Sequence, residues 1–248
     1  MKITTSHVDI RSPDGGHIRT FLAAPQPIGT YPGIIFYSDI FQLSGPMLRA
    51  CSRLAGYGFV VAAPEIYRRI EQPGLVIPFD DQGRDRGIQN AKATPVAYFD
   101  ADCRTVLDYL HGHPAVARGQ VGAAGFCIGG HLAFRAALQP DVKAAVCFYG
   151  TGIHNGALGA DADAGSLQRS GEISGELLLV WGERDPHIPL EGRKQIEETL
   201  QDARVNFSQR HYQAEHAFMR DVGDRYDPEA TDEAFGEMVR FFRRVFVQ

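Results

Sequence analysis

The sequence lacks any long apolar run, which excludes an ordinary membrane-spanning helix. The opening stretch, Met1–Ser6, is also without apolar character, so we expect no secretory signal. Cysteine is scarce, and its four positions are widely spaced and form no CxxC pair. This spacing disfavours a zinc site or a disulfide scaffold, and it suits the reducing environment of the cytoplasm. We therefore expect a cytoplasmic protein without a metal site.

The sequence also has fewer basic than acidic residues. The chain has 25 Lys and Arg against 30 Asp and Glu, a net charge of −5, and its basic residues are scattered. We therefore expect no nucleic-acid partner. Repeats and low-complexity segments are absent, and a hydrophobic content of 44% is ordinary for a globular protein. The length of 248 residues favours a single α/β domain over 1–248, which we expect to be a monomer or a weak homodimer.

Strand patterns alternate with helical patterns along the chain. Largely apolar stretches, typical of strands buried on both faces, occupy 33–37, 59–63 and 142–149, and a further strand is expected at 176–181. Apolar stripes at helical spacing lie in 45–55, 96–110 and 230–246. Between them, 65–95 shows no clear periodicity and is expected to be an irregular, lid-like segment. The alternation predicts an α/β fold, a mainly parallel sheet with helices on both faces.

A glycine-rich stretch, Gly125-Phe126-Cys127-Ile128-Gly129-Gly130, has the pattern of a nucleophile on a sharp strand-to-helix turn. Glycine is needed two residues either side because larger side chains would collide there. The following helix, expected from about His131, would aim free N–H groups and its positive dipole end at the turn and favour a thiolate. Cys127 is therefore a candidate nucleophile, and the alternative is an inert buried cysteine.

Two further residues follow later strands and complete a catalytic set. Asp185 lies in the loop after the strand at 176–181, and His216 follows the last strand. In open parallel sheets functional groups gather at the carboxyl ends of the strands. The order Cys127, Asp185, His216 is the nucleophile–acid–histidine order of the α/β-hydrolase fold. Competing candidates are Glu183 for the acid and His187 or His211 for the base.

The chemistry of these residue types assigns their roles. Cys127 would attack an ester or lactone carbonyl, His216 would transfer the proton, and Asp185 would fix the tautomer of the imidazole. The resulting oxyanion would accept hydrogen bonds from the backbone N–H of Ile128 and from that of Ile40 in the turn after the strand at 33–37. No cofactor is needed for this reaction.

These segments resemble the dienelactone hydrolase family, the carboxymethylenebutenolidases and their relatives. The resemblance extends from 32–41 to the C-terminal helix, and 125–130 is its most specific part because most α/β-hydrolases carry serine at the nucleophile position. Two further segments, 182–185 and 216–218, are similar to the acid and histidine segments of the family. The resemblance implies cleavage of an enol-lactone ring without a cofactor, giving maleylacetate in the degradation of chloroaromatic compounds.

The resemblance also implies residues around the nucleophile. Asp39 stands where the family has a glutamate that helps to activate the cysteine, and it is one methylene shorter; the alternative is that it caps the helix near Gly45 or bonds the turn. Arg220 and either Arg84 or Arg86 stand where arginines hold the substrate carboxylate, or they are solvated surface charges.

Tyr149, at the end of another strand, is a further candidate contact with the substrate. A small, anionic ester or lactone is therefore the expected substrate. Alternatives are a general carboxylesterase or thioesterase with the same catalytic residues, a non-catalytic binding protein that uses the same pocket, and a redox-sensing thiol. The last lacks a resolving cysteine nearby in the sequence.

Overall fold

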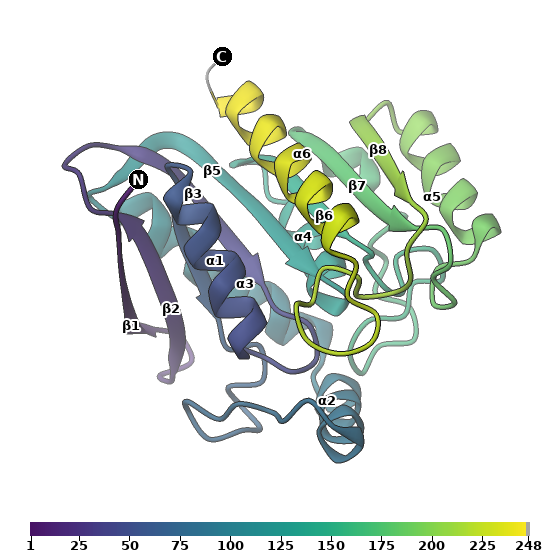
Figure 1. The fold of residues 1–248 in the computed structure, drawn as a ribbon, viewed down its shortest axis with the longest axis horizontal. Coiled ribbons are helices and arrows are strands. Elements are labelled where there is room, and N and C mark those ends of the chain that lie inside the picture. Colours follow the sequence, from purple (N-terminus) through teal and green to yellow (C-terminus); the bar gives the residue numbers. More distant parts are fainter. Residues whose placement is uncertain (247–248) are drawn as a thin grey trace.

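The computed structural model describes residues 1–246, which build one eight-stranded sheet with the order β1-β2-β4-β3-β5-β6-β7-β8 (Figure 1). The strands are β1 (Ile3–Arg11), β2 (His17–Pro25), β3 (Tyr31–Tyr37), β4 (Val60–Pro64), β5 (Val116–Phe126), β6 (Val142–Phe148), β7 (Glu176–Gly182) and β8 (Asn206–Tyr212). Strands β3 to β8 run parallel, and only β2 pairs antiparallel with its neighbours. The prediction of a mainly parallel sheet is confirmed.

Helices cover both faces of this sheet. They are α1 (Gly45–Gly56), α2 (Asp81–Ala93), α3 (Val96–Gly112), α4 (Ile128–Ala136), α5 (Leu190–Asp202) and α6 (Pro228–Phe246), with a short 3₁₀ turn η1 (Ser170–Glu172). In Figure 1, α1 and α6 lie in front of the sheet, α3 and α4 lie behind it, and α2 stands apart below the carboxyl ends of the strands. None of the helices in the described part of the chain is long and apolar enough to cross a membrane.

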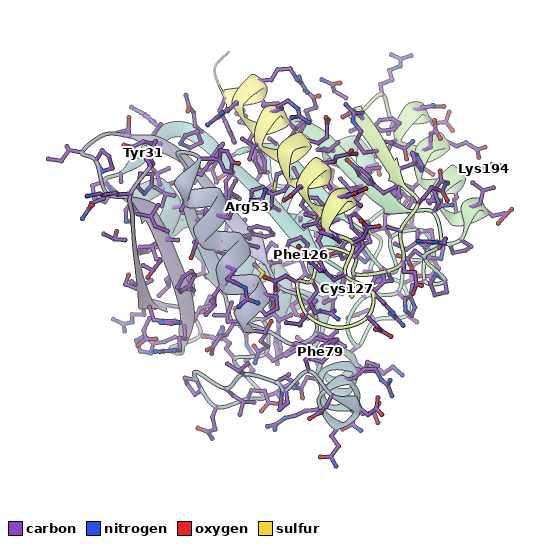
Figure 2. All side chains as sticks on the ribbon, in the orientation of Figure 1. Tyr31, Arg53, Phe79, Phe126, Cys127 and Lys194 are labelled. Carbon is purple, nitrogen blue, oxygen red and sulfur yellow. The ribbon has the colours of Figure 1, made fainter. Side chains whose placement is uncertain are left out.

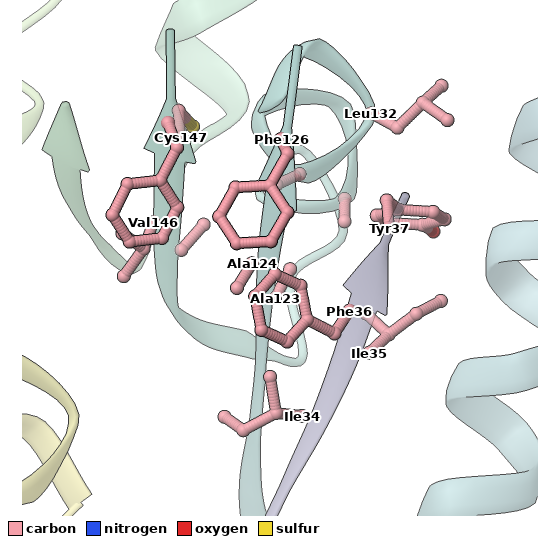
Figure 3. Close-up of a cluster of buried hydrophobic side chains, with 14 of the residues drawn as sticks. Ile34, Ile35, Phe36, Tyr37, Ala123, Ala124, Phe126, Leu132, Val146 and Cys147 are labelled. Carbon is pink, nitrogen blue, oxygen red and sulfur yellow. The ribbon is translucent and has the colours of Figure 1, made fainter. Parts of the chain in front are cut away.

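The centre of the sheet is built from large side chains on β3 set against small ones on β5. Ile34, Ile35 and Phe36 are fully buried, and Ala123 and Ala124 lie beside them (Figure 3). A Cβ at Gly122 would lie 2.7 Å from the carbonyl oxygen of Ala144 on β6. The small residues of β5 therefore let the central strands and their covering helices approach closely, which fixes the position of the turn after β5.

The structure corrects the expectation for 65–95, because this segment contains the helix α2. Asp80 caps it, its side chain accepting a hydrogen bond from Gly83 N at 2.7 Å. The buried residues of this helix are Gly83, Gly87 and Asn90 rather than an apolar stripe, so hydrophobic periodicity gave no sign of it. The helix α4 also starts at Ile128, three residues before the expected His131, because Cys127 itself is its N-cap.

Candidate active site

Five candidate residues follow five different strands at one edge of the sheet. Asp39 follows β3, Cys127 follows β5, Tyr149 follows β6, Asp185 follows β7 and His216 follows β8. Because these strands are parallel, their carboxyl ends lie together. Figure 2 labels Cys127 at the end of β5, with Phe79 below it on the side of α2. The sheet topology alone therefore gathers residues that lie far apart in the sequence.

The backbone of Cys127 is held in a strained conformation, with φ 58° and ψ −121°. Such a conformation is costly for a residue with a Cβ and persists only when its surroundings enforce it. A Cβ at Gly125 would lie 1.9 Å from the carbonyl oxygen of Gly129, and one at Gly129 would lie 2.4 Å from that of Ser38. The two glycines therefore allow the tight turn that presents Cys127, which is partly exposed, at the start of α4.

Asp185 and His216 form a buried pair. His216 Nδ1 lies 2.7 Å from Asp185 Oδ2, and the other carboxylate oxygen accepts the backbone N–H of His187 at 2.8 Å. Burial disfavours the charged imidazole, but the negative charge of Cys127 and the hydrogen bond with Asp185 outweigh it and raise the pKa of His216 to about 9. At neutral pH His216 is therefore charged, and the carboxylate of Asp185 holds its ring in orientation.

None of the competing candidates, Glu183, His187 and His211, takes part in the buried hydrogen bond between His216 and Asp185. Glu183 is exposed and accepts a hydrogen bond from the Gln213 side chain. His211 is exposed on β8 and has no side-chain bond to either carboxylate. His187 lies closer, with its ring centroid 4.7 Å from that of His216 in an edge-to-face arrangement. It packs against the histidine, but it is Asp185 and His216 that share the buried hydrogen bond.

Asp39 forms an ion pair with Arg220 instead of capping α1. Its Oδ2 accepts from Arg220 Nε at 3.0 Å and Nη2 at 2.8 Å, and its Oδ1 accepts from the N–H of Phe41 at 2.9 Å. The guanidinium also lies over the rings of Phe41 and Phe79, 4.9 Å and 4.6 Å from their centroids. The N-cap of α1 is Ser44. Sequence reasoning did not find Phe79, which lies in the segment without periodicity and whose only local signal is the preceding Pro78.

The other two arginine candidates lie on α2. Arg86 pairs with Glu71 through two contacts of 2.6 Å, and Arg84 pairs with Asp81 and Asp85. Their side chains are 48% and 54% exposed, whereas that of Arg220 is 14% exposed. Of the three arginines, the structure brings only Arg220 into contact with another of the candidate site residues.

The two expected oxyanion donors lie at the start of α4 and in the turn after β3. Ile128 is the first residue of α4, so its N–H is one of those that a helix leaves without an internal partner. Ile40 lies in the turn after β3, and Gly87 of α2 packs against this turn: a Cβ there would lie 2.5 Å from the carbonyl oxygen of Ile40. The helix that the sequence did not reveal therefore supports one side of the site.

Tyr149 connects the histidine to a small pocket. Its backbone is left-handed at φ 39°, and its ring lies edge-to-face to His216 with 5.2 Å between centroids. The pocket beside it is lined by Asp39, Ser44, Pro46, Met47, Phe126, Tyr149, Met219 and Arg220. The pocket therefore combines apolar walls with the ion pair of Asp39 and Arg220.

Comparison with known proteins adds independent findings. The model of a family described as the dienelactone hydrolase family matches residues 18–246. A Saccharomyces cerevisiae protein provisionally named a carboxymethylenebutenolidase is 35% identical, over 98% of this chain and 93% of its own length. The carboxymethylenebutenolidase of Pseudomonas putida is 27% identical over 78% and 77% of the two chains. A Klebsiella pneumoniae structure, provisionally described as a dienelactone hydrolase, shares the fold with a TM-score of 0.85 at 23% identity, covering 98% of this chain and all of its own.

Proposed function

Since the chain belongs to the dienelactone hydrolase family and is therefore a hydrolase of ester or lactone bonds, we propose that it works through a Cys127–His216–Asp185 triad and a covalent acyl-enzyme. The observation that carries this proposal is the buried 2.7 Å contact between His216 and Asp185, at the edge of the sheet where Cys127 occupies a strained turn. A paired histidine with a pKa of about 9 supplies the proton that the leaving group needs.

The reaction proceeds in two halves. The Cys127 thiolate attacks the carbonyl carbon, a C–S bond forms, and the carbonyl electron pair moves onto oxygen, where the N–H groups of Ile128 and Ile40 stabilise it. Collapse of this intermediate breaks the C–O bond, and His216 donates its proton to the departing oxygen. In the second half His216 takes a proton from water, the hydroxide attacks the thioester, and the carboxylic acid leaves as the thiolate re-forms.

We further propose that the substrate is anionic and competes for Arg220. Its guanidinium has five N–H donors, and Asp39 takes only two of them, from Nε and Nη2. A substrate carboxylate in the pocket can bind the remaining donors and weaken the hold of Asp39. Asp39 then becomes available to orient Cys127 or His216. Arg84 and Arg86 remain candidates for a second contact only if α2 or their side chains rearrange.

The location and assembly also remain proposals. All four cysteines are free thiols, and free thiols persist most readily in a reducing compartment, so we propose the cytoplasm. We expect a monomer or a weak homodimer, which sedimentation at several concentrations would check.

The test compares hydrolysis of cis- and trans-dienelactone with hydrolysis of p-nitrophenyl acetate, using Cys127→Ala as the control. Strong turnover of a dienelactone that disappears in Cys127→Ala would support both the reaction and the nucleophile. Turnover of the acetate alone, also lost in the variant, would keep the triad and favour a general esterase. Activity that survives in Cys127→Ala would overturn the triad.

A second comparison tests the charge of the substrate. Wild-type enzyme is expected to have a higher kcat/KM for a lactone that bears a free carboxylate than for its neutral methyl ester, because only the carboxylate can pair with Arg220. Equal values for the two compounds would count against an anionic substrate.

A further inference from the structure

Tyr67 carries a hydroxyl group that the described part of the chain leaves without a hydrogen-bond partner. The residue is 1% exposed and is among the largest fully buried side chains, and its Oη contacts no donor or acceptor in residues 1–246. Buried hydroxyls are normally paired, and an unpaired one costs about 1–3 kcal/mol. Such a hydroxyl is free to donate a hydrogen bond to a group that binds beside it.

The topology places Tyr67 on the same edge of the sheet as the nucleophile. It lies just beyond the carboxyl end of β4, and β3 lies between β4 and β5. Asp39 follows β3 and Cys127 follows β5, so the three residues succeed three adjacent parallel strands. Tyr67 therefore lies at the same end of the sheet as Asp39 and Cys127.

The backbone of Tyr67 is held firmly. Its N–H donates to Gln42 Oε1 at 3.2 Å, and its carbonyl oxygen accepts from the N–H groups of Ile70 and Glu71, both at 2.9 Å. Gln42 belongs to the same turn as Ile40, one of the expected oxyanion donors. The backbone of Tyr67 is thus held against that turn, as positioning a preorganised hydrogen-bond donor requires.

The charges around the hydroxyl keep it protonated. Burial raises the pKa of Tyr67 well above its usual value, and the negative charges of Cys127 and Asp39 raise it further. The hydroxyl is therefore always a donor, and it lies within electrostatic range of both groups. Both oxygens of Asp39 already accept hydrogen bonds from Phe41 and Arg220.

We propose that the Tyr67 hydroxyl is a catalytic donor that hydrogen-bonds the acyl oxygen of a substrate held at Cys127, beside the N–H groups of Ile128 and Ile40. This inference rests on the proposed function and adds a side-chain donor to its two backbone donors. The bond forms fully only when negative charge develops on that oxygen, so it lowers the barrier more than it strengthens substrate binding.

The test is Tyr67→Phe, which removes the hydroxyl and keeps the ring. We expect kcat for p-nitrophenyl acetate to fall roughly 10- to 100-fold with little change in KM, the range for a lost hydrogen bond to a charged group. We also expect the melting temperature to stay the same or rise, because the variant removes an unpaired buried polar group. A purely structural hydroxyl would give the opposite pattern.

Tyr37→Phe is the matched control. Tyr37 is also buried, but its hydroxyl is hydrogen-bonded to Cys103. That variant is expected to lose stability and keep its kcat. If Tyr67→Phe loses stability as Tyr37→Phe does, the hydroxyl has an internal partner and the proposal is wrong. If its kcat equals that of wild type, while wild type far exceeds Cys127→Ala, the donor role is wrong although the proposed function stands.

Two further outcomes distinguish failure of the proposed function from a different role of the Tyr67 hydroxyl. A wild-type rate no higher than that of Cys127→Ala would overturn the proposed function, and the donor role with it. The rate at which iodoacetamide alkylates Cys127, followed against pH, tests whether the hydroxyl acts on the thiolate instead. We expect the same profile in wild type and Tyr67→Phe; a shifted profile would overturn the assignment to the substrate.

Discussion

His131 offers a direct test of the buried structure next to Cys127. It is fully buried on α4, with Nδ1 2.9 Å from the carbonyl oxygen of Thr151 and Nε2 2.7 Å from Ser166 Oγ. Since a carbonyl can only accept, Nδ1 carries the proton, and in a neutral ring Nε2 accepts from the Ser166 hydroxyl. Arg135 donates to the same Oγ at 2.9 Å and is itself paired with Asp100. The network is complete only while the ring is neutral.

The size of the loss in the free energy of unfolding at low pH follows from the pKa of the His131 ring. Burial lowers the pKa of His131 from 6.5 to about 3, although the bond to Thr151 opposes the shift. Below pH 6.5 the unfolded chain binds a proton that the folded chain refuses until about pH 3. The stability contributed by the neutral ring is therefore complete above pH 7 and is lost as the pH falls through this window. At about 1.4 kcal/mol per pH unit, the loss between pH 7 and pH 4 is about 3 kcal/mol.

His131→Leu isolates this contribution from all other titrating groups. At pH 7 the variant should be less stable than wild type, because it leaves the Thr151 carbonyl and the Ser166 hydroxyl without their partner. At pH 4 the difference should be smaller by about 3 kcal/mol, since only wild type has paid the protonation penalty. Urea unfolding at both pH values measures the free energy of unfolding.

The neighbouring Leu132→Ala serves as the control. Leu132 is buried on the same helix and does not titrate, so its substitution should cost about 2–5 kcal/mol at either pH. A penalty for His131→Leu that is equal at pH 7 and pH 4 would refute the assignment of a neutral, buried His131.

Three other substitutions test the site. Asp185→Asn should lower kcat about 10⁴-fold and move the alkaline limb of the kcat/KM profile below pH 9, because His216 loses the carboxylate that helps to raise its pKa; an unmoved limb would contradict the pairing. Asp39→Asn should lower kcat/KM for an anionic lactone at least about tenfold, and a wild-type value would remove its orienting role. Gly87→Ala should lower stability by about 1–3 kcal/mol and reduce kcat, since its Cβ meets the Ile40 carbonyl; unchanged urea midpoints and rates would show that α2 does not support the oxyanion turn.

Much of the fold, and the gathering of Cys127, Asp185 and His216 at one end of the sheet, could be predicted because both depend on local signals. Apolar stretches indicated the central strands. The spacing of glycines around Cys127 indicated a tight turn, because a side chain at either glycine would collide with the backbone. Asp185 and His216 were predictable because each follows a strand, and the parallel topology brings such positions together.

Other features could not be predicted because they depend on contacts between distant segments. The pairing of Asp39 with Arg220 joins positions 181 residues apart, and nothing local to either indicates it. Phe79 covers that pair from a segment without periodicity. That the hydroxyl of Tyr67 has no partner among residues 1–246 becomes clear only once the neighbouring residues are placed.

The contact that α2 makes through its glycines lets the catalytic rate and the stability of the fold change separately, although they usually change together. A helix held by backbone contacts at Gly83 and Gly87 buries little apolar surface, so its local opening should cost less free energy than global unfolding. The core around β3 and β5 would remain intact during such an opening, and only the Ile40 side of the site would loosen. Substitutions of exposed α2 residues, unlike Gly87→Ala, can therefore adjust how tightly the transition state is held with little change in the melting temperature, which leaves the catalytic rate free to evolve without endangering the fold.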